Sequence, residues 1–565
     1  MNDLPEVLER LTARLETLER RVASLENREA VAVLPAAPEP SAPAALEFEA
    51  EPSAMRPGGT FQVLGKALLG IAGAYVLRAV AESGALPKLA IAAVATIYAI
   101  LWLVGAARLK SGEWLASIVY SGASALILAP MLWELTLRFK VLPAWAAAGV
   151  LLAFVIAASV LAWKRELTAV FWVGNATAAA AALGLAIATH DLMPFLLVLL
   201  LMVLISEYAA GCDHELSVRP LVALAADLSV CALLFVYSGG QAARAEYPAI
   251  PAPQLLLPGC LLFAIYAGSI TIRTVILRQK ITVFEIGQTM AALLLAACSV
   301  IFFVPGSGML AVGMACLLLC VASYSAAFGL FEKETEKRNF TIFAGWSAGL
   351  LVAGSFLCLT GMTLTSTLSA AAVTAALTGV RLRRRTLEEH ALFYLLAASF
   401  ASGLPQYAMR AMAGTLPLGP GWGIWIAAGG AVACYAAQSL LPTDDWKLRA
   451  GQLISAALAI CAVAALTVKG LLWIATLGIT PEVHHIAFVR TFTMCSLALG
   501  LAYAGARWHR VELTRIAYAA LALLAAKLLF EDLRHGHLEF IAGSIFLFAV
   551  TLITVPRLAR TGQKI

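Results

Sequence analysis

The chain has 565 residues, of which 61% are hydrophobic and 13% are charged, and its formal net charge is +6. A water-soluble protein of this length does not need so much apolar surface, so the composition excludes a soluble enzyme or binding domain. The apolar residues form long runs close to the roughly 20 residues that a helix needs to cross a bilayer. The sequence therefore predicts an all-α polytopic integral membrane protein.

Residues 1–29 have the pattern of a short coiled-coil helix. From Leu4 to Leu25, leucines and one valine recur in alternating steps of four and three, which places them on one helix face. In this register Arg14 faces Glu19 of a parallel partner chain. We therefore expect a homo-oligomer formed through residues 4–25. The alternative is a single amphipathic helix that lies on the membrane or on the protein's own surface.

Two further regions follow this helix. Residues 30–60 are rich in Pro, Ala and Glu without apolar periodicity, which predicts an extended linker. Residues 61–565 form the predicted transmembrane domain, with about eighteen spans. Two of these spans are expected at 391–412 and 421–441.

Loop charges predict the orientation, because Lys and Arg accumulate on the cytoplasmic side. With both termini in the cytoplasm, far more Lys and Arg fall in cytoplasmic than in outer loops, including the four arginines of 381–385. We expect a multi-pass protein of the bacterial inner membrane whose partner is the lipid bilayer. Because the cations lie in loops on one side, the net charge does not indicate nucleic-acid binding.

Two stretches carry a family resemblance. They are "LGKALLGIAGAYVLRAVAESGALPKL" (64–89) and "AKLLFEDLRHGHLEFIAGSIFLFAVTLI" (526–553). The first is a Gly-spaced apolar helix closed by a basic residue, and the second has a lysine and an aspartate before a final Gly-containing helix. Together with the coiled coil and the Pro-rich linker, they resemble a bacterial family of predicted membrane proteins, the domain of unknown function 2339. The resemblance implies the architecture and no activity.

Charged residues inside the predicted spans are candidates for a working site, because each costs roughly 2.5–3.5 kcal/mol at the centre of a helix. Asp227 lies about 12 Å along its helix from Arg219, and its short side chain cannot reach the surface. It either lines a functional cavity or bonds to a neighbouring helix. The intramembrane candidates are Arg78, Glu82, Glu134, Asp227, Arg490 and Lys527.

A second group of candidates falls on the predicted outer side. Histidines and carboxylates at this density are able to bind a divalent metal or relay protons, whereas the alternative is a polar loop with solvated charges. Without an HExxH or CxxC motif, no metal or cofactor is predicted. Lys527 is expected to extend to the surface or to pair with Glu531 and hold the carboxylates in place. The cluster candidates are Glu482, His484, His485, Glu531, Asp532, His535 and His537.

Three functional hypotheses follow from these features. The many spans, the small soluble part and the intramembrane charges favour transport or translocation of a small or amphipathic envelope-related substrate. The coiled coil on a spacer favours a non-catalytic membrane scaffold. The outer histidines and carboxylates favour a membrane-embedded enzyme, the hypothesis with the least support. The sequence does not identify a substrate or an energy source.

Overall fold

The computed structural model describes most of the predicted membrane domain. The predicted coiled coil at 1–29 and the linker up to residue 56 lie outside the described residues, as do Glu482, His535 and His537. The first described helix begins at Pro57, so the last residues of the predicted linker are helical. The described ranges are 57–83, 87–109, 114–165, 167–212, 218–240, 244–333, 337–412, 420–439, 446–476, 483–532 and 538–561.

The prediction of an all-α membrane architecture is confirmed for this part of the chain. It contains no strand, and 16 of its helices are long and apolar enough to cross a membrane. In the first half the helices are α2 (Pro57–Ser83), α3 (Lys88–Ala107), α4 (Trp114–Trp133), α5 (Ala144–Arg165), α6 (Thr168–Ala188), α7 (Leu192–Gly211) and α8 (Arg219–Ser238).

The second half continues the same pattern of apolar helices joined by short connections. These helices are α10 (Ala252–Thr271), α11 (Val283–Phe303), α12 (Gly308–Ala326), α13 (Arg338–Cys358), α14 (Gly361–Leu382), α15 (Arg385–Ser402), α16 (Leu404–Met412), α17 (Trp422–Ser439), α18 (Trp446–Thr476), α19 (Val483–Arg507), α20 (Val511–Lys527) and α22 (Leu538–Thr561).

The structure differs from the predicted spans between residues 391 and 441. The expected span at 391–412 is divided into α15 and α16 by Gly403, whose φ of 73° ends α15 in the left-handed conformation that glycine adopts readily. α15 also begins with charged residues, and α16 has nine residues. These two helices and α17 are not among the 16 candidate spans.

Within the described residues, four helices end in a five-residue π-helical segment. Such segments insert an extra residue into a helix, which turns the following side chains, and they are frequent at functional sites. Three of the four segments carry charged residues of the clusters described below. The segments are η1 (Glu134–Arg138) after α4, η2 (Ile272–Ile276) after α10, η3 (Ala327–Phe331) after α12 and η4 (Leu528–Asp532) after α20.

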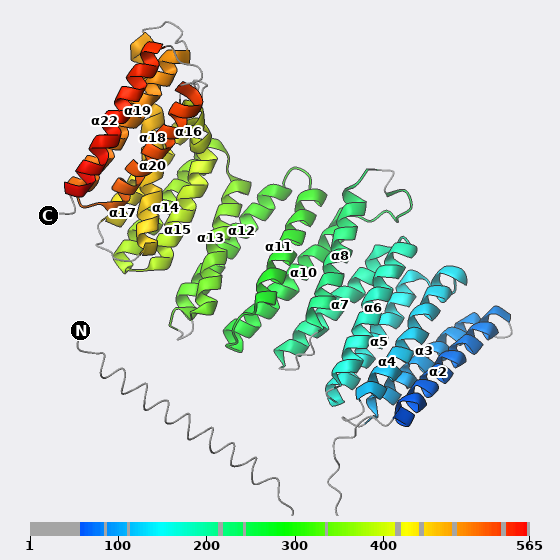
Figure 1. Ribbon diagram of the computed structural model, residues 1–565. Coiled ribbons are helices and arrows are strands. Elements are labelled where there is room, and N and C mark those ends of the chain that lie inside the picture. The colour runs from blue at the N-terminus through cyan, green and yellow to red at the C-terminus, as the bar shows by residue number, and fades with distance from the viewer. Residues whose placement is uncertain are drawn as a thin grey trace, which may run out of the picture. The chain divides into compact units, whose positions relative to one another are not determined.

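Packing within residues 63–565 joins helices that are close in sequence. Consecutive helices pair as α3 with α4, α10 with α11, α12 with α13, and α14 with α15. Figure 1 shows these helices following one another in chain order. Helices that are not consecutive in the chain also pack together, as α4 does with α6, α14 with α17, and α19 with α22. A charged site in this fold is therefore built from a few consecutive helices.

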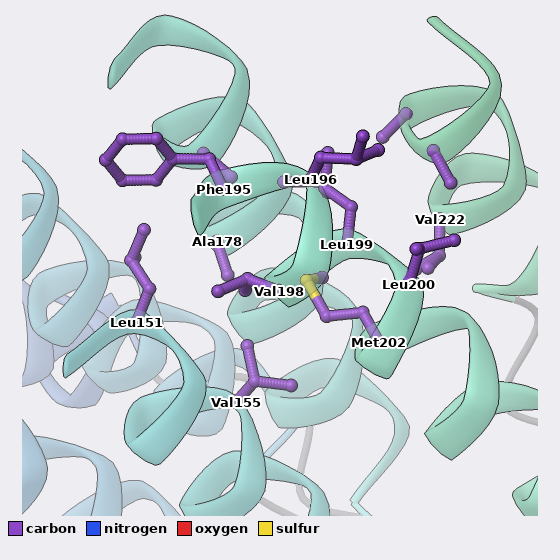
Figure 2. Packing of buried hydrophobic residues seen from close by; sticks show 14 of the residues in the cluster. Leu151, Val155, Ala178, Phe195, Leu196, Val198, Leu199, Leu200, Met202 and Val222 are labelled. Carbon is purple, nitrogen blue, oxygen red and sulfur yellow. The ribbon is translucent and has the colours of Figure 1, made fainter. Parts of the chain in front are cut away.

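The largest apolar core surrounds α7, the most enclosed of the candidate spans. Figure 2 shows Leu196, Leu199 and Met202 of α7 between Leu151 of α5 and Val222 of α8. Phe195 and Leu196 have no exposed surface. This core holds α7 and α8, the helices that carry the buried charges Glu207 and Arg219.

Glycines set the distance between α12 and α13. A Cβ atom built on Gly354 of α13 lies 2.8 Å from Leu317 Cγ and 2.9 Å from the carbonyl oxygen of Gly313. A Cβ atom built on Gly313 would in turn overlap the Sγ atom of Cys358. Small residues allow such close contact in membranes, where apolar surfaces gain little from leaving lipid.

We expect Gly354→Val to destabilise the α12–α13 pair, because the added side chain overlaps the Gly313 backbone. Overpacking of this kind costs roughly 1–3 kcal/mol. The matched control is Gly349→Val on the same helix, since a Cβ atom there has no atom within 4 Å. Thermal unfolding of the purified protein in detergent is the measurement. Equal melting temperatures for the two variants would contradict this account of the contact.

Candidate functional site

Four buried charges form a central cluster where α7, α8, α10 and α11 meet. Its four charged members are each between 4% and 8% exposed. Arg219 donates from Nε and Nη2 to the two carboxylate oxygens of Glu207, at 2.9 and 2.7 Å. Its Nη2 also donates to Glu285 Oε1 at 3.1 Å. Arg273 pairs with Glu285, and Ser269 Oγ donates to Glu207 Oε2 at 2.6 Å.

Two arginines and two glutamates make the central cluster neutral, and each charge has a partner of opposite sign. Neutrality matters because an unpaired buried charge is far costlier than a paired one. Glu285 is also held by a capping box, in which Oε2 accepts from Thr282 N at 2.8 Å and Thr282 Oγ1 accepts from Glu285 N at 3.3 Å. The sequence candidates did not include Arg273 or Glu285, although the Thr-x-x-Glu spacing signals the start of a helix.

A C-terminal cluster brings together four of the sequence candidates. Arg490 is 2% exposed and donates to Glu531 Oε1 and to the carbonyl oxygen of Ala411, both at 2.6 Å. Lys527 Nζ lies 2.5 Å from Asp532 Oδ1. Arg490, Lys527, Glu531 and Asp532 therefore form a second neutral group, which links α19 to η4 and to the end of α16.

The position of Lys527 matches the predicted ion pair with the following carboxylates and not the alternative of extension to the surface. Its side chain is 9% exposed, and its nearest carboxylate is Asp532, because Glu531 Oε2 is 4.0 Å away. The ammonium also donates to Ala487 O at 2.6 Å and Thr491 Oγ1 at 2.7 Å. Three acceptors satisfy its three N–H groups, so Lys527 holds the helices together and has no donor left for a substrate.

A third group lies between α2 and the end of α4. Arg78 Nη1 is 2.9 Å from Glu134 Oε1, and Arg138 Nη1 is 2.8 Å from Glu82 Oε1. Arg78 Nε also approaches Glu82 Oε1 at 3.4 Å. The structure thus joins the sequence candidates Arg78, Glu82 and Glu134, and η1 adds Arg138. This group is more open than the other two, because all its side chains except that of Glu134 are at least 37% exposed.

Beside this group, α2 and α4 enclose an apolar groove of about 270 Å³. Its α2 wall consists of one helix face, and its α4 wall ends at Glu134 in η1. Arg78 and Glu134 are the last residues of the two walls, so their ion pair lies at one end of the groove. The lining residues are Ile71, Ala74, Tyr75, Arg78, Leu126, Ile127, Pro130, Met131 and Glu134.

Asp227 lies apart from the three neutral groups. It accepts hydrogen bonds at 2.9 and 3.0 Å from Nε2 of Gln288 on α11. Among the described residues no cation pairs with it. The contact with Gln288 matches the interpretation of a bond to a neighbouring helix, and Asp227 does not line the groove between α2 and α4.

The histidines and carboxylates predicted to lie on the outer side do not contact the same partners. The rings of His484 and His485 stand 4.2 Å apart, and His484 lies 4.9 Å from the ring of Phe540. Glu531 and Asp532 bond instead to Arg490, Thr491 and Lys527. Among the described residues, no three His, Cys, Asp or Glu side chains are grouped so that they could hold a metal ion.

We expect Lys527→Met to destabilise the protein by about 3–5 kcal/mol, because it leaves Asp532 buried without its cation. The double variant Lys527→Met/Asp532→Leu removes both charges and should recover much of the loss. Chemical or thermal unfolding in detergent measures both effects. A single variant that unfolds like the wild type would show that the pair contributes nothing to stability.

Comparison with protein-family models, with curated proteins and with solved structures finds no match for this chain.

Proposed function

We propose that this chain is a multi-pass protein of the bacterial inner membrane that transports or translocates a small or amphipathic envelope-related substrate. In this proposal the 16 candidate spans, α15 with α16, and α17 make up eighteen spans. Both termini are cytoplasmic, and the N-terminal helix forms a coiled coil with other copies. The resemblance to the domain of unknown function 2339 is part of the same proposal.

The observation that carries the proposal is the groove between α2 and α4. Ile71, Ala74, Tyr75 and Arg78 follow the spacing of one helix face over roughly 10 Å of axis. The face is apolar until its end, where Arg78 meets Glu134. A molecule with an apolar tail and a polar head therefore matches the groove from one end to the other, with the head beside charges of both signs.

The wall on α4 adds a polar feature to this groove. Pro130 lies inside α4, and a proline has no N–H to donate to the carbonyl four residues earlier. The carbonyl of Leu126, which also lines the groove, thus loses its helical donor. This oxygen is able to accept a hydrogen bond from a hydroxyl or amine of a bound molecule.

The alternatives rest on parts of the chain that offer less support. The scaffold hypothesis depends on residues 1–29, which lie outside the described residues. The enzyme hypothesis needs reactive carboxylates beside the histidines, whereas Glu531 and Asp532 are bonded to Arg490 and Lys527. The transport hypothesis rests on the groove between α2 and α4, which lies within the described residues.

We expect the full chain, reconstituted in liposomes of phosphatidylethanolamine and phosphatidylglycerol, to speed the movement of a fluorescent phospholipid between leaflets. The probe is NBD-labelled phosphatidylethanolamine, and dithionite added outside destroys the fluorescence of molecules that reach the outer leaflet. Ala74→Phe should slow the movement roughly tenfold, because a ring in the groove displaces the tail, a loss of about 1.4 kcal/mol.

The matched control is Val76→Phe. Val76 is on the same helix, is 63% exposed and does not line the groove, so its variant should keep the wild-type rate. A second probe, NBD-labelled phosphatidylglycerol, tests an anionic head group. Rates equal to those of protein-free liposomes for both probes, or equal loss in the two Phe variants, would contradict a role of the groove in lipid movement.

A further inference from the structure

Asp227 differs from the carboxylates of the three neutral groups, because among the described residues no cation balances its charge. The central cluster, the C-terminal cluster and the α2–α4 group each pair two carboxylates with two cations. Asp227 has the amide of Gln288 and, among the described residues, no cation. An ionised Asp227 would therefore leave one negative charge uncompensated in the membrane.

The position of Asp227 makes that charge costly. It lies two helical turns into α8, at the edge of a stripe that faces away from the protein. Leu224 and Leu228 in this stripe are 59% and 51% exposed. The carboxylate is thus neither at a helix end nor enclosed by polar groups. In hydrocarbon a neutral carboxylic acid is tolerated far better than a carboxylate, which otherwise binds a proton.

Gln288 is suited to a carboxyl group that gains and loses a proton. Its Nε2 donates to both oxygens of the carboxylate, and its own oxygen is an acceptor. When Asp227 is protonated, its O–H can donate to that oxygen while Nε2 donates back, which gives a neutral pair with two hydrogen bonds. The Gln288 side chain is 8% exposed and lies one turn beyond the capping box of Thr282 and Glu285, so its place is fixed.

The neighbouring helices do not offer a free cation to Asp227. α8 packs against α6, α7, α10 and α11, and α6 has no ionisable side chain. Arg219 is bonded to Glu207 and Glu285. Cys231 on α8 and Tyr266 on α10 are close enough to interact with the charge of Asp227. α8, α7 and α11 also carry the ionisable side chains of Arg219, Glu207, Glu285 and Cys298.

We propose that Asp227 is a proton-binding site within the membrane, where the carboxyl group is neutral when protonated and paired with Gln288. A metal cation is a poorer occupant, because Nε2 of Gln288 directs its hydrogens at both carboxylate oxygens. The site lies on α8 and α11 and does not depend on the groove between α2 and α4. It supplies a group through which a proton gradient can act on these helices.

Dicyclohexylcarbodiimide tests the proposal, because it is an apolar reagent that attaches to protonated carboxyl groups inside membranes. The full chain in lipid nanodiscs is treated at several pH values, and peptide mass spectrometry locates the adduct. We expect Asp227 to be labelled, with labelling that falls as the pH rises. Glu207 and Glu285 are internal controls and should stay unlabelled, because each is paired with arginine.

Asp227→Asn should lose the adduct and the infrared absorption of a protonated carboxyl group, while its amide still bonds Gln288 and preserves the fold. Addition of sodium ions at fixed pH should leave labelling unchanged. Two results would overturn the proposal: labelling of Asp227 no greater than that of Glu207 at every pH with no carboxylic-acid absorption, or protection by sodium, which would assign a cation site instead. Neither result bears on lipid movement through the groove.

Discussion

The ion pairs of Arg219 with Glu207 and Glu285 show the constraint on which the rest of the structure depends. A charge placed among apolar helices must be matched by an opposite charge and by hydrogen bonds, or its desolvation outweighs what it contributes. The central cluster meets this requirement with residues from α7, α8, η2 and α11. Its neutrality requires that these helices keep one relative arrangement, since movement of any one of them would strand a charge.

The same requirement explains how a chain of mostly local helix pairs is held in order. Apolar helices gain little by leaving lipid for each other, so packing relies on small residues such as Gly354 and on polar contacts. The contact of Arg490 with Glu531 joins residues 41 positions apart, and its bond to Ala411 spans 79 positions. Polar groups therefore connect parts of the chain that apolar pairing alone would leave separate.

Hydropathy was enough to predict helices and membrane class, because the length of an apolar run is a local property. In-span charges were also visible, and Arg78, Glu134, Arg490 and Lys527 were found as single residues. The ion pair of Lys527 with Glu531 follows from their one-turn spacing and was predicted. The other pairings were not, because η1 and η4 rotate Glu134, Glu531 and Asp532 relative to a regular helix. Glu285 was missed because it begins its helix, and its contacts depend on how α8 and α10 approach it.

Two features of the described helices depart from the neutral, tightly packed pattern: the groove beside α2 and the carboxylate of Asp227. Coupling between distant sites needs packed elements that contact both. α6 packs against α4, which forms one wall of the groove, and against α8, which carries Asp227. Asn175 of α6 is 1% exposed, and among the described residues its Oδ1 accepts no hydrogen bond. A buried acceptor without a donor costs stability, so the helix that contacts both features is itself held less firmly by polar contacts than the helices of the neutral clusters.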